Sequence, residues 1–157
     1  MAPSRHPVAA PVIAGALLLI VLAGFWFTAI YSRPSDESHT HASRLELDKT
    51  YILEEKRTEA EQVRGLSGRA SLSGSNGMVF IYSTVAERCM WMKEMRFAID
   101  IIWLDSDNRI VRVQNSLAPE SYPQTFCANA RYVVELPAGT AARNKLAVGQ
   151  TAALRIQ

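Results

Sequence analysis

The strongest hydrophobic pattern in the chain is an uninterrupted apolar run near its beginning. Val12–Ile30 carries no charged side chain, and its 19 residues would extend roughly 28 Å as a helix at about 1.5 Å per residue. This length is close to the ~30 Å hydrocarbon core of a bilayer. Aromatic residues gather toward the end of the run, where their rings favour the membrane interface. The pattern predicts a transmembrane anchor over residues 8–31, preceded by a stub over residues 1–7.

A cleaved signal peptide or a buried core helix would also be apolar. A signal peptide has a shorter apolar region of about 7–15 residues and small residues before its cleavage site, which Ala29-Ile30-Tyr31 matches poorly. A core helix in a small domain would show a polar stripe, and this run shows none. The flanking Lys and Arg residues do not decide the orientation. Because the globular part follows the span, we expect a single-pass protein of the cell membrane whose domain faces the extracytoplasmic side.

The segment after the anchor is polar. Residues 32–43 contain no Val, Leu, Ile or aromatic side chain, which predicts a flexible linker. His39 and His41 within it could touch a metal ion, but two imidazoles on a mobile chain make a weak site, so a solvated linker is the better interpretation.

From residue 44 onward, short alternating or apolar runs predict a β-rich domain over residues 44–157. The capping box at Thr58 and Glu61 predicts a helix over residues 59–64. Turn residues after Leu104 predict a hairpin. We expect an α+β fold, with one small, partly closed antiparallel or mixed sheet and two short helices. The second helix is expected over residues 138–145. Alternating residues near 45–47 and 51–53 predict the first strands, and further strands are expected over 78–82, 90–92, 97–104, 110–117, 132–136 and 152–156.

Composition and charge narrow the functional classes. The 157 residues include 17 basic and 15 acidic side chains without a block of one sign, so no nucleic-acid partner is expected. All three histidines precede the domain, which excludes a histidine-based catalytic triad or a histidine-rich zinc site within it. There is no glycine-rich phosphate loop, and we expect no cofactor and no metal ion.

The domain contains two cysteines, Cys89 and Cys127. In an oxidising compartment they could form a disulfide across the central hairpin. Two separate buried thiols are the alternative, which would suit a cytoplasmic domain. We favour the disulfide.

Asp100 is the one charged residue in an otherwise apolar run over residues 97–104. A buried carboxylate needs a partner, and Lys93, Arg69 or backbone N–H groups of the 93–97 connection are the expected ones. Asp100 could therefore be a structural residue that fixes this connection, or a carboxylate that faces a ligand. Trp91 and Lys93 could together bind an anion or a sugar ring, although a core Trp and a solvated Lys are the more ordinary interpretation.

Five motifs follow one another along the domain. They are Gly65-Leu66 with Arg69 and Leu72, Gly77-Met78-Val79-Phe80, Trp91-Met92-Lys93, Ile99-Asp100-Ile101-Ile102, and Tyr132 to Leu136 with Ala138-Gly139 and Val148-Gly149. In this order they resemble the motifs of an uncharacterised prokaryotic family, domain of unknown function 192, over about residues 55–157. The chain departs from the family pattern at four positions: Met90 where Phe is usual, Glu94 where Asn or Asp is usual, Ala98 where Pro is usual, and Gln150 where Asp is usual. The resemblance implies a compact β-rich domain, often exported or anchored by one amino-terminal span, but no particular activity. It marks Arg69, Trp91, Lys93, Asp100 and Glu135 as signature positions.

These observations are compatible with three functions. The favoured hypothesis is a binding module for a small polar or glycan-like ligand, with Trp91, Lys93, Asp100 and Arg69 as its site. The alternative is a glycoside-type hydrolase that uses Asp100 and Glu135, which requires both carboxyl groups in one cleft about 5–10 Å apart. A purely structural accessory protein is the third possibility.

Overall fold

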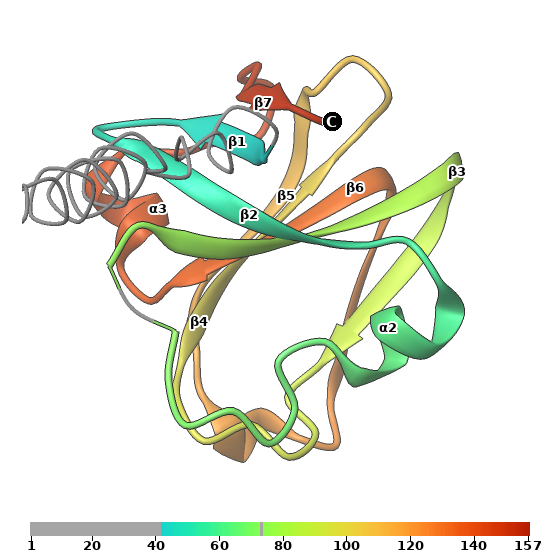
Figure 1. The fold of residues 1–157 in the computed structure, drawn as a ribbon, viewed down its shortest axis with the longest axis vertical. Coiled ribbons are helices and arrows are strands. Elements are labelled where there is room, and N and C mark those ends of the chain that lie inside the picture. The colour runs from blue at the N-terminus through green and yellow to red at the C-terminus, as the bar shows by residue number, and fades with distance from the viewer. Residues whose placement is uncertain (1–41, 73) are drawn as a thin grey trace, which may run out of the picture. The chain divides into compact units, whose positions relative to one another are not determined.

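The computed structural model describes residues 42–72 and 74–157, which form one seven-stranded sheet with short helices (Figure 1). The strands are β1 (Ser43–Glu46), β2 (Thr50–Lys56), β3 (Asn76–Trp91), β4 (Ile99–Leu104), β5 (Ile110–Leu117), β6 (Thr125–Pro137) and β7 (Ala153–Arg155). Their order in the sheet is β5-β4-β6-β3-β2-β1-β7. The helical elements are α2 (Glu59–Arg64), α3 (Thr140–Arg143) and a 3-10 turn at Pro119–Ser121.

The sheet is mixed and curls back on itself. Neighbouring strands pair antiparallel except β2 and β3, which are parallel because the connection through α2 crosses over between them. A bridge between Arg109 and Thr151 links the chain before β5 to the chain before β7. Ile110 and Gly149 extend this link through backbone hydrogen bonds. The two outer strands thus approach each other, which confirms the expected β-rich fold with a curled mixed sheet.

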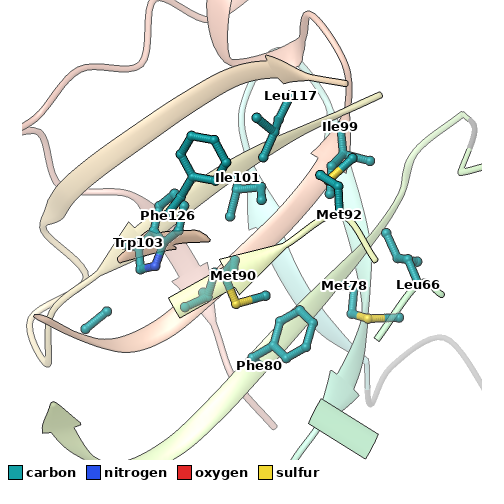
Figure 2. Packing of buried hydrophobic residues seen from close by; sticks show 12 residues of the cluster. Leu66, Met78, Phe80, Met90, Met92, Ile99, Ile101, Trp103, Leu117 and Phe126 are labelled. Carbon is teal, nitrogen blue, oxygen red and sulfur yellow. The ribbon is translucent and has the colours of Figure 1, made fainter. Parts of the chain in front are cut away.

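Two hydrophobic clusters cover the two faces of the central strands. Side chains alternate along β4, so Ile101 and Trp103 enter one cluster and Ile102 enters the other. For this reason every residue of β4 is buried. The first cluster, which Figure 2 shows, comprises Leu66, Met78, Phe80, Met90, Met92, Ile99, Ile101, Trp103, Leu117, Phe126, Ala130 and Val133.

Strands β3 and β6 continue beyond the sheet as a two-stranded extension, residues 86–91 and 125–130, which we call the distal ribbon. Ile81 pairs with Tyr132, but the next pair joins Ala86 to Ala130, so β3 holds three extra residues at this bulge. The ribbon is held against the first cluster by Met90 and Phe126 on its inner face.

Several elements match the sequence predictions, and others differ from them in length. The helix at Glu59–Arg64 and the hairpin between β4 and β5 are confirmed. β3 is one long strand rather than two, because its middle, residues 83–87, is exposed and lacks the apolar alternation that would reveal it. β6 likewise begins at Thr125 rather than Tyr132, and α3 is shorter than residues 138–145.

The predicted anchor, Val12–Ile30, lies outside the described residues, as does most of the predicted linker. Across residues 42–72 and 74–157, the structure contains no helix that is long and apolar enough to cross a membrane. The domain begins with β1, whose first residue, Ser43, is buried.

Candidate functional site

A pocket of ≈ 160 Å³ opens beside α2 and reaches inward to β6. Its walls come from α2, the turn that follows it, β3 and the chain just after β3. We call it the Glu135 pocket, and its lining residues are Glu59, Gln62, Val63, Arg64, Gly65, Leu66, Ser67, Phe80, Tyr82, Cys89, Met90, Trp91, Met95 and Glu135.

Local sequence fixes α2 as one wall of this pocket. Thr58 and Glu61 form a reciprocal capping box, which satisfies backbone N–H groups at the start of the helix. Gln62 Nε2 donates to the carbonyl of Ile81, 3.1 Å away, and so holds α2 against β3. Gly65 ends the helix with φ +45°, and a Cβ there would lie 3.2 Å from Phe80 Cζ. Glycine therefore allows the turn to pass close to Phe80.

Glu135 is the carboxyl group within this pocket. In the sheet it lies opposite Met78 on one side and Ile101 on the other, so its side chain enters the first cluster. Glu135 is 4% exposed, and its Oε2 atom has no hydrogen-bond partner within the described chain. Burial raises the pKa of Glu135 to about 8, although the positive charge of Arg69 acts in the opposite direction. At pH 7 Glu135 is therefore mainly protonated and can both donate and accept a hydrogen bond.

Tyr82 brings a second polar group to the same pocket. Its ring is half-buried, and the guanidinium of Arg88 lies over it, 3.9 Å from the ring centroid. Burial raises the pKa of the Tyr82 hydroxyl above its ordinary value of 10.0, with a smaller opposing contribution from Arg88. The pocket thus presents a neutral phenol and a neutral carboxylic acid among apolar walls at physiological pH.

Asp100 is buried on the other face of the sheet. It lies opposite Leu136, whereas Glu135 is the neighbouring residue on β6, so the two carboxyl groups project from opposite faces. The structure therefore does not bring Asp100 and Glu135 into one cleft.

Backbone amides surround the Asp100 carboxylate. Oδ1 accepts from the N–H groups of Ser116 at 2.7 Å and Gly139 at 3.1 Å, and Oδ2 accepts from Ala141 N at 2.6 Å. These contacts fit a structural role for Asp100, but the predicted partners were wrong. The carboxylate is bound by the N–H groups above and not by Lys93, Arg69 or the 93–97 connection. Asp100 instead ties the end of β5 to the start of α3, where the positive φ angles of Ser116 and Gly139 orient the backbone.

The other three residues of the predicted ligand site are dispersed. Arg69 Nη2 donates to Glu54 Oε2 at 2.6 Å, and Arg69 lines two other pockets that do not include Glu135. Lys93 is exposed, and its carbonyl accepts a hydrogen bond from Ser67. Trp91 lines the Glu135 pocket and is 36% exposed. Strand alternation directs its side chain away from Met90 and Met92, so Trp91 belongs to the rim of the pocket.

Cys89 and Cys127 face each other in the distal ribbon. They form a directly opposed pair in the β3–β6 ladder, and their sulfur atoms are at disulfide distance, 2.05 Å. The favoured pairing of the two cysteines is therefore confirmed in the structure, and the alternative of two separate thiols is not found. Cys89 also lines the Glu135 pocket, so the bonded pair borders its wall.

The sequence was compared with models of protein families, and one of these models matches most of the chain. The family DUF192, described as "Uncharacterized ACR", matches residues 40–154. The chain belongs to DUF192. No protein with a curated description is similar enough to match.

Two crystal structures share the fold of this DUF192 domain. A protein of unknown function from Novosphingobium aromaticivorans is 25% identical, with a TM-score of 0.64, over 71% of this chain and 82% of that one. A proposed transcription regulator from Sinorhizobium meliloti is 24% identical, with a TM-score of 0.64, over 72% of this chain and 90% of that one. At 24% identity, the similarity to the Sinorhizobium meliloti protein shows only that the two chains share a fold.

The five positions that the sequence resemblance marked as signature positions therefore do not form one site. Trp91 and Glu135 line the same pocket, Arg69 acts on Glu135 through its charge, and Asp100 organises backbone on the far face of the sheet. Sequence reasoning singled out Glu135 only through the family resemblance. The available signal was its position as a charged residue inside the apolar run of residues 132–136. No pattern in the sequence indicated that α2 would form part of the pocket wall.

Proposed function

We propose that this DUF192 domain is a binding module for a small, neutral, polar ligand of glycan-like character, held in the Glu135 pocket. One observation carries the proposal: a buried carboxyl group, with an oxygen that has no partner among the described residues, lines a cavity. An unpaired buried polar group is unfavourable, so a ligand that supplies the missing hydrogen bond gains the corresponding free energy.

The lining of the pocket indicates the chemistry of the ligand. Protonated Glu135 offers a donor and an acceptor, which suits a hydroxyl or carbonyl group rather than an anion. Apolar side chains such as Phe80, Met90 and Leu66 suit a ring with an apolar face. The volume of ≈ 160 Å³ is below the range of about 300–1,000 Å³ for drug-sized ligands, so the pocket fits a compound of about one ring.

The proposed location of this module is the extracytoplasmic side of the cell membrane, with Val12–Ile30 as a single transmembrane anchor. The length and composition of that apolar run support the anchor. The Cys89–Cys127 pair supports an oxidising compartment, where disulfides persist. Fractionation tests the anchor: full-length protein that stays in the soluble fraction without detergent would contradict it.

Ligand screening by thermal shift, with two matched variants, tests the binding function. The panel contains monosaccharides and other neutral single-ring compounds at millimolar concentration. Val63 is 58% exposed on α2 and lines the pocket, so Val63→Trp narrows the pocket without disturbing the core. Val85 is 46% exposed in β3 and does not line the pocket, so Val85→Trp is the matched control.

The proposal expects at least one compound that stabilises the unmodified protein and the Val85→Trp variant but not the Val63→Trp variant. A compound that stabilises all three proteins equally would place binding elsewhere. No stabilisation by any compound of the panel would overturn the assignment of a neutral single-ring ligand.

A carboxylate-based hydrolase is the second candidate, and the raised pKa of Glu135 is the observation that favours it. A general acid must be protonated at the working pH, and Glu135 meets that requirement near pH 7. Asp100 is on the opposite face, so the second carboxyl of such an enzyme would be Glu59, which is exposed on α2 and lines the same pocket. Hydrolysis of aryl glycosides that is abolished by Glu135→Gln and by Glu59→Gln would support this activity; absence of turnover would exclude it for those substrates.

A further inference from the structure

The outer face of the distal ribbon gathers side chains that can bind a metal ion. Glu87 precedes Cys89 by two residues on β3, so strand alternation places both on the same face, and Cys127 lies directly opposite Cys89. One atom from each of the three side chains, a carboxylate oxygen of Glu87 and the two sulfurs, lies within 4.8 Å of the others. Glu87 is exposed and both cysteines are half-buried, so solvent reaches the group.

We propose that Glu87, Cys89 and Cys127 bind zinc, or a similar thiophilic divalent cation, when the disulfide between the two cysteines is reduced. Two thiolates and one carboxylate form a donor set that Zn²⁺ accepts, and thiolates select against Mg²⁺ and Ca²⁺. Three protein ligands leave one tetrahedral position for water. Cys89 also lines the Glu135 pocket, but the metal site does not rest on the binding function proposed for that pocket.

Reduction must come before metal binding. A dithiol reductant supplies two electrons and two protons, the S–S bond breaks, two thiols form, and the reductant becomes a disulfide. Binding of the cation then displaces both thiol protons into solvent, because thiolates are the ligands. The same two sulfur atoms cannot serve the disulfide and the cation together, so oxidation of the ribbon expels the metal.

Contacts other than the disulfide keep the two cysteines in place. Trp103 Nε1 donates to the carbonyl of Arg88 at 2.9 Å, and Arg112 Nη1 donates to the carbonyl of Cys127 at 2.7 Å. On the inner face of the ribbon, Met90 and Phe126 are buried in the first cluster (Figure 2). The reduced ribbon therefore retains the side-by-side arrangement of its strands, and Glu87, Cys89 and Cys127 stay together on its outer face.

Cobalt titration of the full chain tests the site, because Co²⁺ occupies zinc sites and shows thiolate-to-metal absorption. The protein, in detergent, is reduced with a phosphine under anaerobic conditions, and far-ultraviolet circular dichroism verifies that it stays folded. We expect a charge-transfer band that saturates at one Co²⁺ per chain, that Zn²⁺ removes, and that is absent from the oxidised protein.

Two substitutions separate this site from adventitious binding. Cys127→Ser should abolish saturable binding, and Glu87→Gln should weaken it by roughly tenfold or more. Glu120→Gln, at an exposed carboxyl in the 3-10 turn, is the matched control and should leave binding unchanged. The proposal is overturned if the reduced, folded protein gives no thiolate band, if Glu87→Gln binds as tightly as the unmodified protein, or if the reduced chain is unfolded.

Discussion

Glu135 of β6 lies directly opposite Met78 of β3 in the sheet. On its other side it pairs with Ile101 of β4, and both of these apolar residues are fully buried. This position withdraws the carboxyl group from water, which is why its pKa rises to about 8. The Glu135 pocket therefore contains a neutral acid at physiological pH, on which the proposed binding function rests.

Stability should fall as the pH rises from about 5 to 8. The unfolded chain releases the Glu135 proton near pH 4.5, whereas the folded chain holds it until about pH 8, so the folded state binds more protons in this window. The stabilisation that comes from this bound proton is fully present below pH 4.5 and is lost as the pH rises through about 8. Its slope is at most about 1.4 kcal/mol per pH unit. Urea denaturation at successive pH values measures it.

The Glu135→Gln variant should remove this slope, because glutamine does not titrate. Glu59→Gln alters an exposed carboxyl of the same pocket and should keep the slope. A Glu135→Gln protein whose stability depends on pH as strongly as that of the unmodified protein would show that another group is responsible.

Removing the Asp100 carboxylate should destabilise the domain strongly. Asp100→Ala leaves the N–H groups of Ser116, Gly139 and Ala141 without their acceptor, at a cost of about 3 kcal/mol or more. Asp107→Ala, in the exposed β4–β5 turn, should change the free energy of unfolding by less than about 0.5 kcal/mol. Chemical denaturation measures both, and a loss below about 1 kcal/mol for Asp100→Ala would contradict the structural role.

A methyl group at Gly77 should not fit into the sheet. Its Cβ would lie 2.6 Å from Leu53 Cδ2 and 2.9 Å from Leu136 Cδ2, so we expect Gly77→Ala to cost about 1–3 kcal/mol. Gly68 has open space around it and φ +76°, so Gly68→Ala should cost about 1 kcal/mol through backbone strain alone. A Gly77→Ala variant that melts at the same temperature as the unmodified protein would argue against the close packing at Gly77.

Reduction of the Cys89–Cys127 disulfide should lower the free energy of unfolding by at most about 4 kcal/mol. The pair is separated by 38 residues, and closing a loop of that size restricts the unfolded chain by this amount. Urea denaturation with and without reductant measures the effect, and the Cys89→Ser, Cys127→Ser double variant should be insensitive to reductant. If reductant leaves the free energy of unfolding of the unmodified protein unchanged, the disulfide does not constrain the unfolded chain.

The sequence predicted features that depend on residues close together in the chain. It did not predict features that depend on contacts between distant segments. The Thr58 capping box predicted α2 because both of its partners lie within four residues. The partners of Asp100 were mistaken because Ser116 and Gly139 come from segments that the sheet brings together only after folding. The middle of β3 escaped prediction because a two-stranded ribbon with an exposed face has little apolar alternation. The location of Glu135 within a cavity depends on α2 and β3 together, which no local pattern reports.

The ionisation of Glu135 is the most direct test of the binding account. A ¹³C NMR titration of protein labelled at glutamate carboxyl carbons, with Glu135→Gln for assignment, gives its midpoint. We predict a midpoint near pH 8 in the free protein. A midpoint near pH 4.5 would mean that Glu135 is charged and solvated at pH 7, and it would contradict a pocket built for a neutral ligand.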